Sequence, residues 1–145
     1  RKFYSNTSPE YVGLSPEEWR EKSILIRREH ELTHYYTKTF YGSASNNLHD
    51  ELIADFIGMY SALGRYSAKL FRHFMGLDGS DGRLSLYTSG LSAESQRAVA
   101  EIACECSDAL EAWQDSEAFR KMETHSRIDY LCQLGIRGII RNIPH

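Results

Sequence analysis

Apolar residues recur at intervals of three and four along most of the chain, which is the spacing of amphipathic α-helices. Alternation with a period of two, the signal of a half-buried strand, is nearly absent. The pattern therefore predicts a mostly α fold, a helical bundle with little or no β-sheet. A chain of 145 residues is long enough for one hydrophobic core, so residues 1–145 are expected to form a single domain.

The first long helix has a clear start signal. Ser15 and Glu18 match a capping box, and Pro16 occupies the first helical position, where proline is favoured. The apolar spacing that follows predicts a helix that runs to about Phe40.

The second long helix follows a short polar connection. Asn46 or Asn47 is expected to cap it, and its apolar positions continue to about Met75, where Gly76 is expected to stop it. Because the connection is short, the first two helices are expected to lie antiparallel as neighbours and to form a helix hairpin.

The rest of the chain predicts a loop and two further helices. Residues 76–90 are rich in glycine, serine and aspartate and are typical of a mobile surface loop. Ser92 is expected to cap a helix that ends near Trp113. A fourth helix is expected over residues 117–134, with Gly135 as its stop and the apolar tail beyond it packed back onto the body.

One motif on the first helix indicates metal chemistry. His30, Glu31 and His34 form an H-E-x-x-H motif, in which the two histidines lie one turn apart on one helix face and can reach one ion. The carboxylate of Glu31 projects beside that ion, where it can take a proton from a metal-bound water.

A second pair of residues extends this site onto the second helix. Glu51 and Asp55 are four residues apart and share a face. At about 1.5 Å per residue, Glu51 falls nearest His34, and Asp55 falls at the level between the two histidines. His30, His34 and Glu51 then make a two-histidine, one-carboxylate site with an open fourth position, which is the pattern of catalytic zinc. Asp55 is expected to accept the free N–H of a ligand histidine, for which His30 is favoured.

These residues resemble the gluzincin class of zinc metallopeptidases, in which H-E-x-x-H is followed by E-x-x-x-D on the next helix. The resemblance covers about residues 15–75. It implies one zinc ion, a peptide or amide substrate, and hydrolysis through a zinc-bound water. It also implies the site residues, which are the general base Glu31, the zinc ligands His30, His34 and Glu51, and Asp55, which holds a ligand histidine in place.

The segment before the motif differs from what the resemblance implies. Gluzincins usually place a β-sheet before the first of these helices and bind the peptide on its edge strand, but residues 1–29 show almost no strand pattern. Two expectations follow: the chain is a fragment of a longer protein, or it is a reduced helical relative that handles its substrate differently.

Two other functions fit the same residues. Glu31 and His34 also read as one E-x-x-H ligand pair of a di-metal carboxylate bundle, although no second E-x-x-H occurs in the sequence. A non-catalytic helical interaction module with a structural or vestigial metal site is the other alternative.

The sequence offers several candidates for two further roles, a transition-state stabiliser and a substitute metal ligand. A hydrolase needs a group that stabilises the transition state, and the sequence does not choose among the available side chains. The candidates are His125, Arg127, Tyr130, Tyr60 and Tyr66. His49 is a possible substitute ligand, but it is expected to point away if Glu51 points into the site.

Composition and charge limit the classes of partner and the compartment that are expected for this chain. The formal net charge of −3 argues against a nucleic-acid partner, and no apolar run is long enough for a membrane span. The odd number of cysteines does not suggest a disulfide framework, and Cys104 and Cys106 point to nearly opposite sides of a helix. A reducing, cytoplasmic compartment is the default expectation.

Overall fold

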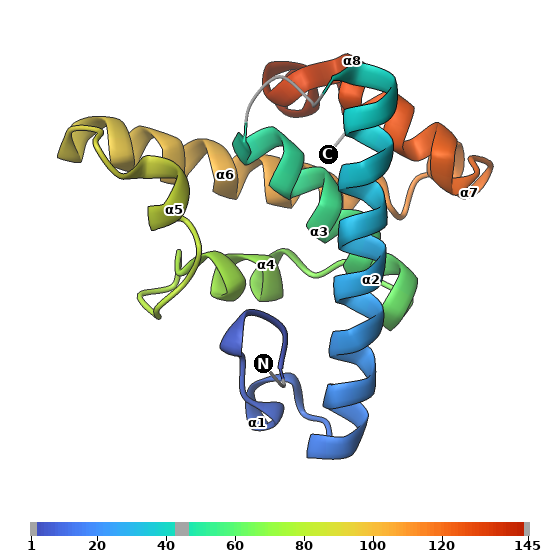
Figure 1. Ribbon diagram of the computed structural model, residues 1–145. Coiled ribbons are helices and arrows are strands. Elements are labelled where there is room, and N and C mark those ends of the chain that lie inside the picture. The colour runs from blue at the N-terminus through green and yellow to red at the C-terminus, as the bar shows by residue number, and fades with distance from the viewer. Residues whose placement is uncertain (1–2, 43–46, 144–145) are drawn as a thin grey trace.

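The computed structural model describes residues 3–42 and 47–143, and every regular element in these two ranges is a helix (Figure 1). The predicted mostly α fold with little or no β-sheet is thus confirmed for the described residues. In chain order the elements are the 3₁₀-helix η1 (Tyr4–Asn6) and the α-helices α1 (Pro9–Val12), α2 (Pro16–Tyr41), α3 (Asn47–Leu63), α4 (Ala68–Met75), α5 (Ser85–Thr88), α6 (Ala93–Trp113), α7 (Glu117–Arg120) and α8 (Thr124–Asn142).

Helix α2 begins and ends as predicted. The Ser15 hydroxyl accepts from the Glu18 amide at 3.1 Å, and the Glu18 carboxylate accepts from the Ser15 amide at 3.2 Å, so the capping box is formed. The helix ends at Gly42, whose φ of 69° is the left-handed conformation that glycine adopts readily. The result is one straight element that can carry the whole H-E-x-x-H motif.

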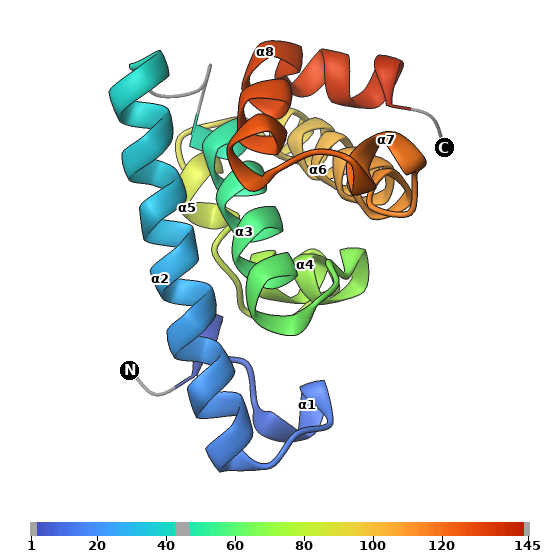
Figure 2. The same cartoon turned by 90° about the vertical axis from the view of Figure 1, so that its right-hand side faces the viewer.

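Helix α3 runs back alongside α2 and is the central element of the fold. Figures 1 and 2 show the two helices antiparallel, as predicted, with α6 and α8 on the other side of α3. The expected cap at Asn46 or Asn47 lies outside the residues whose side chains the structure describes. Because α3 is covered on several sides, residues that it directs toward α2 are buried, among them Glu51 and Asp55.

The second predicted helix is in fact two helices. Helix α3 ends at Leu63, and Gly64 follows with a φ of 78°. Helix α4 begins after its N-cap Ser67, whose hydroxyl accepts a hydrogen bond from the Leu70 amide at 3.1 Å. The prediction of one helix to Met75 was wrong because the apolar spacing continues across the break. The end of α4 at Gly76 was predicted correctly.

The C-terminal helices also differ from the prediction. Helix α6 matches it, including the cap at Ser92. The expected helix over residues 117–134 is instead the short α7 and the longer α8. Gly135 interrupts the helical backbone with φ 68° and ψ 175°, as predicted for a helix stop, and a second helical stretch within α8 follows it to Asn142. The second half of α8 continues because it buries Ile139 against the core, so the tail packs back as expected.

None of the helices in the described ranges combines the length and the apolar character that a bilayer crossing requires.

The close approach of α2 and α3 depends on Gly58. A Cβ atom at this position would lie 2.9 Å from the Ile26 carbonyl oxygen and 3.2 Å from Ile26 Cγ2, which is too close for either contact. An alanine in a helix interior normally stabilises it by about 1 kcal/mol relative to glycine. At Gly58 the clash with Ile26 should outweigh this gain, so that alanine destabilises the protein.

We therefore expect Gly58→Ala to lower the free energy of unfolding by about 1–3 kcal/mol, because α2 and α3 must separate to admit the methyl group. Urea denaturation of the variant and of the parent protein measures this difference. Ser95→Ala, on an exposed part of α6, is the control and should change little. A Gly58→Ala variant as stable as the parent would show that the helix contact tolerates a Cβ atom.

Candidate metal centre

The hairpin of α2 and α3 brings the predicted ligands together. His34 Nε2 lies 3.0 Å from His30 Nε2 and 2.8 Å from Glu51 Oε1, and His30 Nε2 lies 3.4 Å from the same oxygen. Within the described ranges, His30, His34 and Glu51 form a group whose ligand atoms all lie within 4.8 Å of one another. As predicted from helix depth, Glu51 is nearer to His34.

These distances fit a small tetrahedral ion. Ligand atoms about 2.0–2.1 Å from a tetrahedral zinc lie roughly 3.3 Å from one another. The three observed separations, 2.8, 3.0 and 3.4 Å, scatter around that value. Two imidazole nitrogens and one carboxylate oxygen are also a donor set that zinc accepts in catalytic sites. The residues present therefore fit one zinc ion, held by three ligands.

Asp55 lies behind His30, as predicted. Its Oδ1 is 2.9 Å from His30 Nδ1, so the carboxylate holds the ring with Nε2 turned toward His34 and Glu51. The hydroxyl of Tyr4 donates to the same oxygen at 2.6 Å and lies 2.8 Å from His30 Nδ1. The imidazole is therefore fixed in the orientation that a metal ligand requires.

Arg83 completes the network from the segment between α4 and α5. Its Nη1 donates to Glu51 Oε2 at 2.9 Å, and its Nη2 pairs with Asp55 Oδ2. It therefore binds the oxygen of Glu51 that faces away from the histidines and leaves Oε1 directed at them. The segment itself is anchored, because the Arg83 amide donates to the Phe74 carbonyl at 3.1 Å.

The charges in this network shift its pKa values in consistent directions. Burial disfavours the imidazolium of His30, but the hydrogen bonds to Asp55 and Glu51 outweigh it and raise the pKa of His30 to about 9. Burial would raise the pKa of Asp55, yet the charge of Arg83 and the contact with His30 lower it below its usual range. The pKa of Glu51 is lowered in the same way, against its burial, by hydrogen bonds to the two histidines. Both carboxylates are thus ionised at neutral pH.

Glu31 occupies the open side of the ligand group. Its Oε1 lies 4.0 Å from His30 Nε2, and its side chain is 70% exposed. Its carboxylate thus lies beside the ligand group, on the wall of a concave region along α2.

Two concave regions flank the ligands along α2. The larger, of about 870 Å³, is lined by Tyr4, His30, Glu31 and Arg83 together with residues of the N-terminal segment and the loop after α4, and is called the large cleft below. The smaller, of about 440 Å³, lies on the side of His34 and Glu51. The ligand group therefore sits between two recesses, either of which can admit part of a substrate.

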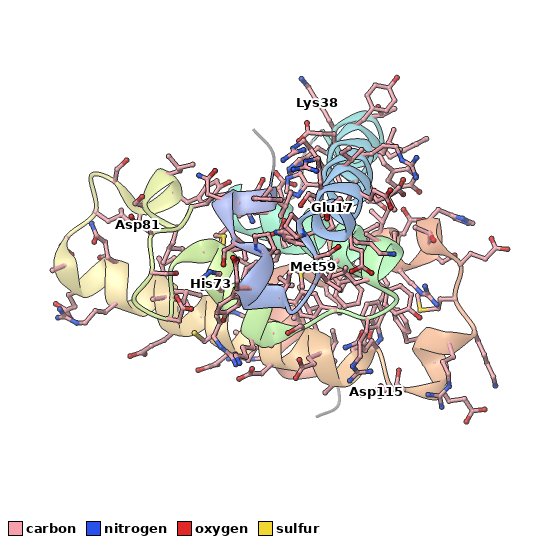
Figure 3. All side chains as sticks on the ribbon, turned by 90° about the horizontal axis from the view of Figure 1, so that it is seen from below. Glu17, Lys38, Met59, His73, Asp81 and Asp115 are labelled. Atoms are coloured by element: carbon pink, nitrogen blue, oxygen red, sulfur yellow. The ribbon has the colours of Figure 1, made fainter. Side chains whose placement is uncertain are left out.

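Figure 3 shows how the large cleft is enclosed. His73 of α4 lies against the N-terminal segment, where its ring stacks on Tyr11 with the centroids 3.7 Å apart. Asp81, on the loop that follows α4, lies on the far side of that segment from α2. The cleft is thus bounded by α2 on one side and by this loop on the other.

The candidates for a transition-state stabiliser lie outside the ligand group. His125 is exposed beside Glu123, and Arg127 packs over the Phe119 ring and donates to the Phe119 carbonyl.

The tyrosine candidates are also packed away from the ligands. Tyr130 stacks on Trp113, and Tyr60 packs edge-on against Phe119. Tyr66 is fully buried, and its hydroxyl has no hydrogen-bond partner among the described residues. His49 points away from the site as expected, with Nε2 3.0 Å from the Leu131 carbonyl oxygen of α8.

Sequence reasoning missed Tyr4, at the start of η1, and Arg83, from the segment between α4 and α5. The prediction of a mobile surface loop over residues 76–90 did not include a residue that pairs with buried carboxylates. One signal was present: Glu51 and Asp55 were expected side by side, and two neighbouring buried carboxylates require a cation. The sequence did not indicate which arginine supplies it.

A sequence model with the description "Family of unknown function (DUF7005)" matches residues 1–141, so the chain belongs to that family. No curated protein and no solved structure matches the chain.

The pairing of Arg83 predicts a large stability effect. Arg83→Gln should destabilise the metal-free protein by about 3–5 kcal/mol, because it leaves the two buried carboxylates of Glu51 and Asp55 with the imidazolium of His30 as their remaining cation. Urea denaturation measures it. Arg65→Gln is the matched control, since Arg65 makes a bidentate pair with Asp115 on the surface, with side chains 57% and 60% exposed. Equal losses in both variants would contradict the structural role of Arg83.

The raised pKa of His30 predicts a pH dependence. A histidine whose pKa is higher in the folded state contributes stability that is complete below its unfolded value and is lost as the pH rises through its folded value. The metal-free protein should therefore lose about 1–3 kcal/mol of stability as the pH rises from about 6.5 to about 9. Denaturation in the presence of a chelator measures the loss, and His30→Gln should abolish most of it. His125→Gln, an exposed histidine, should retain it.

Proposed function

We propose that this member of the DUF7005 family is a zinc-dependent hydrolase that cleaves a peptide or amide bond. The observation that carries the proposal is the meeting of His30, His34 and Glu51, with ligand atoms within 4.8 Å of one another and Glu31 on their open side. The order of these residues along the chain also resembles that of gluzincins, and this resemblance rests on the same motif.

The residues that would hold the ion are the three named ligands, oriented by Asp55 and Arg83. A zinc ion bound there would supply a Lewis acid that lowers the pKa of a water and polarises a carbonyl oxygen. The ligand carboxylate Glu51 is kept in place by Arg83, and His30 is kept in place by Asp55 and Tyr4.

Glu31 is the proposed proton carrier. Its carboxylate takes a proton from the attacking water and returns it to the nitrogen of the leaving amine as the C–N bond breaks. The other water atoms remain on the acyl carbon as the new carboxyl group. Such a residue must reach both the water and the leaving group, and the exposed side chain of Glu31 at the edge of the large cleft has that freedom.

The charge balance of the centre supports this chemistry. Glu51 and Asp55 contribute two negative charges and Arg83 one positive charge, so a divalent cation would leave the buried network with a net positive charge. A positive, partly enclosed site favours the oxyanion that develops when an amide is attacked. With no arginine at position 83 the same network would be neutral.

A non-catalytic interaction module is the second candidate, and one observation favours it. Helix α2 exposes several large apolar side chains on its outer surface, including Leu32 at 54%, Tyr35 at 71% and Phe40 at 67%. Exposed aromatic and aliphatic groups of this kind occur at protein contacts. In this case the metal would hold the hairpin together without performing hydrolysis.

Elemental analysis of the purified protein tests the metal. We expect about one zinc ion per chain, lost in His34→Ala because two ligands cannot retain it, and kept in His125→Ala, which removes an exposed histidine outside the centre. Zinc that is absent from the parent protein, or that persists in His34→Ala, would refute the site. Two irons per chain would favour the di-metal bundle instead.

Hydrolysis of a peptide library by the zinc-loaded protein tests the reaction. Glu31→Gln should keep the zinc and lower the rate by about 100-fold or more, since the proton carrier is gone. Glu29→Gln is the matched control, because Glu29 pairs with Arg28 outside the centre, and it should keep its activity. A chain that binds zinc but cleaves no peptide would favour the interaction module.

A further inference from the structure

The large cleft contains a cationic side chain that the proposed reaction does not use. Arg27 lines it together with His30 and Glu31, and these three residues are spaced i, i+3 and i+4 along α2. Side chains with this spacing lie on one helix face, about 5–6 Å apart at Cβ. Arg27 therefore stands one helical turn from the ligand His30, on the floor of the same cleft.

The other charged groups of the cleft are paired with one another or placed elsewhere, and Glu31 lies 4.0 Å from His30 Nε2. Arg83 is held by Glu51 and Asp55, and His73 pairs with Asp78 at 2.7 Å. Asp81 lines the opposite rim (Figure 3). Arg27 is half-buried, and its contact among the described residues is with the Tyr4 ring, 5.9 Å from the guanidinium carbon to the centroid. Glu31 lies one turn along the same face, but no ion pair of 4.0 Å or less joins a carboxylate to Arg27 in the described ranges, so this half-buried guanidinium is free to bind an anion.

Two polar atoms buried in residues of the cleft wall are also unpaired. Ser5 Oγ and Arg83 Nε have no hydrogen-bond partner among the described residues, and both residues line the cleft. The arginine nitrogen is a donor only, and a serine hydroxyl can donate. Buried donors without acceptors are rare in folded proteins.

We propose that Arg27 binds a carboxylate of the substrate next to the scissile bond, so that the centre prefers substrates with an acidic group at that position. This inference rests on the proposed function for the place of the scissile bond. Successive peptide residues advance by about 3.3–3.6 Å, so a carboxylate on the residue that adjoins the bond reaches one helical turn along α2. The carboxylate is either a glutamate or aspartate side chain or the C-terminus of the substrate.

The binding of short peptides separates these two sources and does not require turnover. Zinc-loaded Glu31→Gln protein, which cannot complete the proposed proton transfer, is titrated calorimetrically with N-acetyl-Ala-Glu amide and with its neutral partner N-acetyl-Ala-Gln amide. N-acetyl-Ala-Ala with a free C-terminus and its amidated form make the second pair. In at least one pair the acidic member should bind about tenfold tighter, the usual effect of a charge-assisted hydrogen bond.

Substitution of Arg27 then shows whether this residue causes the tighter binding of the acidic peptide. Arg27→Gln should remove it by weakening the acidic member about tenfold, with the neutral member unchanged, and Arg27→Lys should retain part of it because the charge remains. Arg28→Gln is the matched control, because Arg28 is the next residue, 61% exposed and paired with Glu29. Thermal unfolding and zinc content of each variant show that the fold and centre persist.

The outcomes distinguish this inference from the proposed function. Equal binding of the acidic and neutral members, or an equal loss in Arg28→Gln, would overturn the role of Arg27. A preference for the acidic member that depends on Arg27, in a protein that cleaves no peptide, would support the anion site and refute the hydrolase. The same titrations without zinc keep the test of Arg27 independent of metal binding.

Discussion

The fold around the candidate centre depends on one buried carboxylate. Asp55 has no exposed surface, and an ionised carboxylate in that position is costly unless cations and hydrogen-bond donors surround it. Its partners come from three other parts of the chain: Tyr4 of the N-terminal segment, His30 of α2, and Arg83 of the segment between α4 and α5. Each partner must be in place for the carboxylate to be tolerated. The burial of Asp55 therefore links the positions of these three segments at one point.

The same constraint prepares the centre for a metal. Because Asp55 and Arg83 fix the orientations of His30 and Glu51, the three ligand atoms already lie at separations close to those of a tetrahedral zinc site. Little reorganisation is then needed on binding, and outer residues of this type usually contribute strongly to metal affinity. A site kept only as a structural remnant would also need its carboxylates neutralised, so the network alone does not require catalysis. What favours catalysis is Glu31, which approaches this network at His30 Nε2, 4.0 Å away, and is largely exposed.

The residues that could be predicted from the sequence are those positioned by local rules. His30, His34, Glu51 and Asp55 follow from helix periodicity and a short connection, so their meeting needs only that α2 and α3 be antiparallel neighbours. Tyr4 and Arg83 follow no such rule, because η1 and the segment between α4 and α5 bring them to partners far away along the chain. The helix breaks at Gly64 and Lys121 were missed for a related reason: the apolar spacing describes which residues are buried, and it continues when the backbone turns while the core stays the same.

The wall of the cleft that faces α2 suggests how a substrate would be recognised. In the described N-terminal residues this wall is a short turn with Ser5 and Asn6 at φ of 50° and 56°, which is a left-handed conformation that costs energy in residues other than glycine. Such a turn cannot present the regular row of amides and carbonyls with which an edge strand binds an extended peptide. On this side of the cleft a substrate must then be recognised by side chains, which can distinguish the charge and shape of one or two substrate residues. A preference for a carboxylate at Arg27 is the form of specificity that this architecture can provide.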